Sequence, residues 1–128
     1  MASAAGEEIN VRIIETPISL DEFRATCCTT FGDMVKIDVD IERGVIAADA
    51  EMHSDLEDLL LENGSRQENI WGANIFPDSI DQNFVEYTSL INIRPGSGNM
   101  SMEIESQELR NVIRQIIQRL IVRAFNDS

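Results

Sequence analysis

Residues 88–104 read TSLINIRPGSGNMSMEI, and this stretch decides how the second half of the chain is organised. The apolar run 90–93 predicts a strand in the middle of a sheet. Gly96 and Gly98 predict a loop after it, because glycine allows backbone conformations in which N–H groups face outward. The remaining residues predict a short strand that leads into the last helix. The loop is therefore the first place to look for a small binding site.

The last helix has the clearest periodic pattern in the chain. It is expected to begin at Glu105 or Ser106 and to continue over about four turns. Its apolar positions recur at helical spacing and are Leu109, Val112, Ile113, Ile116, Ile117, Leu120 and Ala124. This stripe predicts that one face of the helix packs on the sheet.

The remaining elements follow from shorter patterns. Strands are predicted at residues 11–15, 34–41, 45–50, 69–76 and 84–94, the last being the longest. Residues 34–41 alternate between apolar and polar positions, which indicates a half-buried strand, whereas residues 45–50 are expected to be covered on both faces. One helix is predicted from Ser19 to Gly32 and another from Ser54 to Gly64. Each begins with a capping box, Ser19 with Glu22 and Ser54 with Glu57.

The element order is therefore β-α-β-β-α-β-β-α. It predicts an α+β fold, a two-layer sandwich with a mixed, mostly antiparallel sheet of about five strands and three helices on one face. Residues 9–125 are expected to form a single domain, with a disordered tail at 1–8 and a short tail at 126–128.

Charge and composition exclude several classes of protein. The net charge of −13, from 23 acids against 10 bases, would repel nucleic acid and anionic lipid. No segment approaches the roughly 20 apolar residues of a membrane span. The first residues lack the pattern of a signal peptide. The adjacent cysteines Cys27 and Cys28 are expected to be reduced thiols, so we expect a cytoplasmic protein.

Several blocks of the sequence resemble a known family. They are residues 31–36, residues 52–57, Trp71-Gly72 within residues 59–77, residues 88–95, and Gly98-Asn99. Together they are similar to a family of small bacterial and cyanobacterial proteins that is a domain of unknown function. The resemblance spans residues 9–120. It implies a bacterial, intracellular, single-domain protein, and it supplies neither an activity nor site residues.

The loop after residue 93 carries the first candidate site. Arg94 beside the backbone donors and side chains of Ser97, Gly98, Asn99 and Ser101 is chemically suited to a carboxylate or a phosphate. The pattern is not a Walker loop, because no Gly-Lys-Ser/Thr closes it. The alternative is a plain turn whose arginine pairs with an acid of this chain.

Asp49, Glu51 and His53 form the second candidate. In an extended chain these alternate residues point the same way, and their side chains are plausible ligands for zinc or manganese. The alternative is a solvated strand end before a helix cap. We expect no metal and no cofactor. His53 is the only histidine, so histidine-dependent mechanisms would all require it.

Charge is also segregated along the chain. After Glu108 the last helix carries Arg110, Arg114, Arg119 and Arg123 with no acid before Asp127. These arginines either cover the edges of the apolar stripe or contact a partner. The stripe widens toward Ile121, Val122 and Phe125. We therefore predict a homodimer whose interface includes Arg119, Val122, Arg123 and Phe125.

Two functions remain open on the sequence. One is a non-enzymatic binding, interaction or regulatory module that acts as a homo-oligomer. The other is a small enzyme or a binder of a small anionic ligand, using the Arg94 loop with or without His53. Trp71, the single tryptophan, is expected to be a core or interface anchor.

Overall fold

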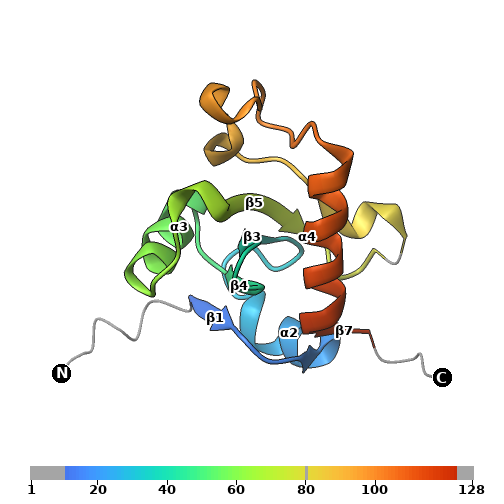
Figure 1. Cartoon of the computed structure of the whole chain (residues 1–128). Helices are drawn as coiled ribbons and strands as arrows, with labels where there is room; N and C mark the ends of the chain where they lie inside the picture. Colours follow the sequence, from blue (N-terminus) through green and yellow to red (C-terminus); the bar gives the residue numbers. More distant parts are fainter. Residues whose placement is uncertain (1–10, 80, 124–128) are drawn as a thin grey trace.

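A computed structural model describes residues 11–79 and 81–123. Its main sheet has the strand order β1-β4-β3-β5-β6, and every pairing in it is antiparallel (Figure 1). The strands are β1 (Arg12–Ile14), β3 (Val35–Asp40), β4 (Val45–Ala48), β5 (Ile70–Ile75) and β6 (Val85–Glu86). The helices are α2 (Leu20–Cys27), α3 (His53–Glu62) and α4 (Gln107–Leu120). The predicted α+β class, and broadly the predicted order of elements, are confirmed.

A small second sheet joins the two ends of the described chain. It pairs β2 (Ile18–Ser19) in parallel with β7 (Ile121–Val122). The predicted end of the last helix is therefore wrong, because the helix stops at Leu120 and Ile121 is buried in a strand pair. The predicted tails at 1–8 and 126–128, like Ala124 and Phe125, lie outside the described residues.

Helices cover both faces of the main sheet, so the prediction of a two-layer sandwich with helices on one face is wrong. Helices α2 and α4 pack on the face that carries Val35, Ile37 and Val39, whereas α3 packs on the face that carries Ala47 and Ile70 (Figure 1). The α3 side of β3 holds Asp38 and Asp40, and both are fully buried. Because this face of β3 carries polar residues, the sequence predicts that it faces solvent, but α3 covers it. The four residues of β4 are buried on both faces, as predicted.

The helix starts follow the predicted caps at two of three positions. Ser19 Oγ accepts a hydrogen bond from the Glu22 N–H at the start of α2, and Ser106 Oγ accepts one from the Leu109 N–H at the start of α4. The predicted capping box at Ser54 is wrong. Helix α3 begins two residues earlier, at His53, with Met52 at the cap position and no side-chain cap. The Glu57 carboxylate of that box instead pairs with Arg94 at 3.4 Å.

The long fifth strand predicted at 84–94 is the main error, because only Val85 and Glu86 pair with β5. Residues 88–103 form a hairpin that contains the 3₁₀ turns Leu90–Asn92 and Pro95–Ser97. Ser89 Oγ accepts a bond from the Ile91 N–H, which favours the turn over a strand. The Asn92 amide bonds to both the N–H and the C=O of Gly72 in β5.

We expect the buried stripe of α4 to supply much of the folding free energy. Ile117 is 1% exposed, whereas Val112 on the same helix is 40% exposed. Ile117→Ala should lower the free energy of unfolding by roughly 2–5 kcal/mol, because it leaves a cavity in the core. Val112→Ala should change it by less than about 1 kcal/mol. Urea denaturation of both variants measures the difference, and equal losses would contradict the packing described.

Candidate functional site

The side chain of Arg94 is largely covered, and 14% of it is exposed. Its Nε donates to the Ile91 carbonyl, its Nη1 to the Gln67 carbonyl and its Nη2 to the Glu57 carboxylate in α3. The guanidinium also lies 4.7 Å from the centre of the Trp71 ring. Burial lowers the pKa of Arg94, and the carboxylates of Glu57 and Asp38 oppose this change. Arg94 therefore attaches the hairpin to α3 and the sheet.

The loop after Arg94 directs its polar groups inward. The amide nitrogen of Asn99 donates to the carbonyls of Asn92, Ser101 and Glu103, and its oxygen accepts from the Glu105 N–H. The N–H groups of Ser97, Gly98 and Asn99 bond to carbonyls of Arg94 and Pro95. Ser101 Oγ donates to the Glu103 carbonyl. These groups build the loop instead of facing an incoming anion.

A hollow of about 480 Å³ lies beside Arg94, and Ser97 and Glu57 also line it. His53 is not among its lining residues. His53 starts α3, is buried, and lies with Nε2 2.9 Å from the Ala73 carbonyl. That carbonyl can only accept, so Nε2 carries the hydrogen. Burial lowers the pKa of His53, and the Ala73 carbonyl opposes this change. Arg94 and His53 therefore do not share this hollow.

The Asp49, Glu51 and His53 side chains do not converge either. The expected extended backbone is absent at Asp49, whose φ is +77°. The Asp49 carboxylate accepts bonds from the N–H groups of Thr29 and Thr30 and from the Thr29 hydroxyl, whereas Glu51 is exposed. Within residues 11–79 and 81–123, no cluster of three or more His, Cys, Asp or Glu side chains could hold a metal ion.

Asp38 is a buried acid, whereas the alternating pattern of residues 34–41 predicts that its side chain faces solvent. It is 0% exposed, and neither of its carboxylate oxygens has a hydrogen-bond partner among the described residues. Burial raises the pKa of Asp38 well above its ordinary value, the nearby Glu57 raises it further, and Arg94 opposes them. The strand alternation that located Asp38 could not reveal α3 above it.

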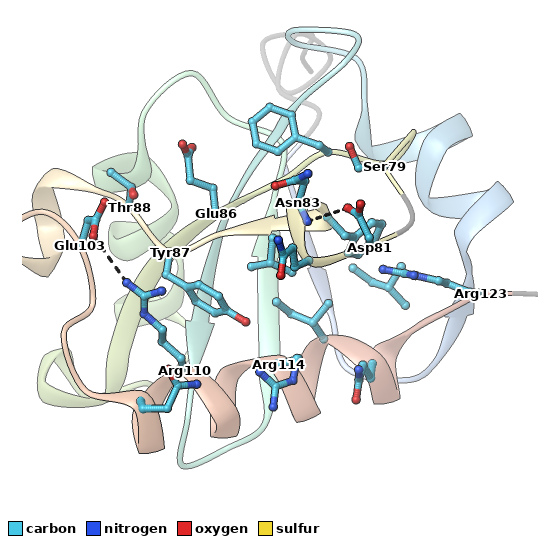
Figure 2. Close-up of a pocket in the computed structure, with 18 of the residues that line it drawn as sticks. Ser79, Asp81, Asn83, Glu86, Tyr87, Thr88, Glu103, Arg110, Arg114 and Arg123 are labelled. Carbon is cyan, nitrogen blue, oxygen red and sulfur yellow. Dashed lines mark hydrogen bonds and ion pairs between the residues drawn. The ribbon is translucent and has the colours of Figure 1, made fainter.

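A groove with a volume of about 1160 Å³ lies between α4 and the segment around β6 (Figure 2). Val85, Tyr87 and Val122 are the accessible apolar residues of its lining, and the buried Ile117 and Ile121 lie beneath them.

Figure 2 shows the Tyr87 ring, which follows β6, directed toward α4, with Arg110 beside it. Arg114 lies along the helix, where its Nη2 donates to the Asn111 side-chain oxygen at 2.8 Å. Arg123 lies beyond the end of α4 on the same side of the groove.

The two walls of this α4–β6 groove differ in charge. Arg110, Arg114 and Arg123 belong to the α4 side, and Asp81, Glu86 and Glu103 belong to the other. Arg110 and Glu103 form an ion pair at 3.6 Å. Arg110 lies 5.0 Å from the centre of the Tyr87 ring, and Arg123 lies 4.0 Å from that of Phe84. The guanidinium groups of Arg110 and Arg123 thus make cation–π contacts with aromatic rings of the groove.

The predicted interface residues are divided between two surfaces. Val122 and Arg123 line the groove. Arg119 lies on the other flank, where its Nη2 donates to the Gly44 carbonyl at 2.8 Å. Phe125 lies outside the described residues. The sequence identified the arginines of α4 but not the groove, because nothing in it placed Tyr87 and Phe84 opposite the helix.

A comparison with protein families matches residues 12–120 to a family described as "Protein of unknown function (DUF5674)". The chain belongs to this family. The match covers most of the 128 residues and confirms the resemblance found in the sequence. Neither a curated protein nor a solved structure matched the chain. In the described part of this family member, no helix is long and apolar enough to cross a membrane.

Asp38 predicts a pH dependence of stability. Its pKa is higher in the folded state than the ordinary 3.8, so the folded state binds this proton more tightly than the unfolded state does. Stability is therefore lost as the pH rises from about 4 through the folded-state pKa. Asp38→Asn removes this titration and should make the protein more stable than wild type near neutral pH, with the advantage shrinking toward pH 4.

Chemical denaturation between about pH 4 and pH 8 measures this effect. The matched control is Asp33→Asn, at an exposed position before β3, which should follow the wild-type curve. If the difference between Asp38→Asn and wild type is the same at every pH, Asp38 is not the buried, unpaired acid described.

Proposed function

We propose that this protein is a non-catalytic binding module of the bacterial cytoplasm whose α4–β6 groove holds an acidic segment of a partner protein. The observation that carries the proposal is the groove itself, with three arginines on one wall above an apolar floor. In a chain of net charge −13 with only 10 basic residues, the arginines on the α4 side attract the carboxylates of an acidic segment by charge complementarity, and Asp81, Glu86 and Glu103 on the other side confine those carboxylates to the α4 side.

The shape of the groove supports a polypeptide ligand. Its volume of about 1160 Å³ lies near the upper end of the range of roughly 300–1000 Å³ found for ligand pockets, which gives room for a short polypeptide segment. Apolar floor residues suit the side chains of an extended or helical segment, and arginine heads suit its carboxylates. The strongly negative chain opposes nucleic acid as a ligand.

The cytoplasmic location rests on the cysteines. Cys27 and Cys28 are free thiols, and Cys27 is buried in the core. Burial raises the pKa of Cys27, which keeps the thiol protonated and unreactive. This is the state expected of cysteines in a reducing compartment.

Binding of a short fluorescent peptide of alternating glutamate and leucine tests the proposal. Fluorescence anisotropy should show binding that weakens as salt is added, because the attraction is between charges. Arg114→Glu should weaken it by about tenfold or more, since it replaces an attraction by a repulsion. Arg114 is exposed on α4, so its replacement should leave the fold intact.

Arg66→Glu is the matched control. It makes the same change in net charge at an exposed residue that does not line the groove and should leave the affinity close to that of wild type. If both variants weaken peptide binding equally, the overall charge of the protein determines the affinity and the groove does not. No binding at low salt would reject the acidic-segment proposal.

A further inference from the structure

In the hairpin 88–103, small polar side chains are buried and large apolar side chains are exposed. Its small polar side chains Ser89, Asn92 and Asn99 are buried, at 2%, 0% and 5% exposure. Large apolar side chains of the same hairpin face outward, with Leu90 70% and Met100 66% exposed, and Ile93 and Met102 also exposed. A water-soluble loop ordinarily shows the opposite distribution, so these exposed side chains require an explanation.

The hydrogen bonds of the hairpin keep this arrangement fixed. The Asn92 amide bonds to Gly72 of β5 and also to the Met102 carbonyl. The Asn99 amide connects both sides of the hairpin through the carbonyls of Asn92 and Glu103. Turning Leu90 or Met100 inward would break these bonds and leave buried amides unpaired, which is costly. The apolar side chains are therefore presented outward by the fold.

We propose that the hairpin 88–103 is a self-association surface, through which two copies of the chain pack apolar side chains against each other about a two-fold axis. Leu90, Ile93, Met100 and Met102 would supply the contact. Methionine suits such a surface, because its flexible, polarisable side chain adapts to its neighbours. The proposal does not depend on the α4–β6 groove, which none of these four residues lines.

Charge argues that the occupant is a second copy. Two chains of net charge −13 repel unless they meet where acids are few, and residues 87–102 contain no Asp or Glu. The acids beside them are Glu105, which accepts from the Met100 N–H, and Glu68, which lies beside Leu90 and Ile93. Arg94 is the one charged residue of this stretch, and Glu57 neutralises it at 3.4 Å. At a two-fold axis a surface meets itself, so a mainly apolar surface is compatible with its copy. A two-fold contact through the α4–β6 groove would instead bring the arginines of one copy close to the arginines of the other.

Analytical ultracentrifugation of the full chain at micromolar concentration tests the proposal. Wild type should sediment at twice the chain mass of 14.4 kDa. Leu90→Glu and Met100→Glu should each raise the dimer dissociation constant by about tenfold or more, because a two-fold axis places each new charge in the interface twice. Both side chains are mostly exposed, so thermal unfolding should show that the variants remain folded.

Val112→Glu is the matched control, because Val112 is an exposed apolar residue of α4 outside the hairpin. This variant should remain dimeric. A monomeric wild type overturns the proposal, and so does a dimer that dissociates on Val112→Glu but not on the hairpin substitutions. Arg114→Glu should leave the dimer unchanged, so peptide binding and self-association can fail separately.

Discussion

The bidentate contact between the Asn92 side-chain amide and the Gly72 backbone is the constraint on which the second half of the structure depends. At the outer edge of β5, β6 pairs only with Asn74 and Ile75, and the Asn92 amide satisfies the N–H and C=O of Gly72 at 2.9 Å and 3.0 Å. The hairpin 88–103 is thereby attached to the sheet without being a strand. A side chain at Gly72 would collide with Ser89, since an added Cβ would lie 2.6 Å from the Ser89 Cβ.

The hairpin is attached on its other side through Arg94. Its guanidinium joins carbonyls of the hairpin and of the segment before β5, a carboxylate of α3 and the ring of Trp71. The same polar layer contains Asp38, which has no hydrogen-bond partner among the described residues and opposes folding when it is ionised. Residues that resemble a ligand site in the sequence thus join α3, β5 and the hairpin, and the exposed groove lies on the opposite side of the sheet, beside α4.

Local patterns in the sequence predict the fold where local chemistry decides it. The stripe of α4, the β3–β4 hairpin and the cap at Ser19 require only neighbours in the chain, and all three are present. The apolar run at 90–93 has the composition of a buried strand, but amide contacts with Gly72 and Met102 hold it as a turn. Such contacts join residues far apart in sequence, so no periodic pattern reveals them. The groove was missed for the same reason, because it forms only when α4 lies beside Tyr87.

Hydrogen exchange at the Gly72 amide, followed by NMR in the native state, tests this account most directly. Gly72 faces no neighbouring strand at the outer edge of β5, so its protection depends on the Asn92 side chain. We expect the Gly72 amide to exchange as slowly as the Ala73 amide within the same strand, through global unfolding. Exchange of Gly72 at the rate of an unstructured chain, with Ala73 still protected, would show that Asn92 does not fix the hairpin.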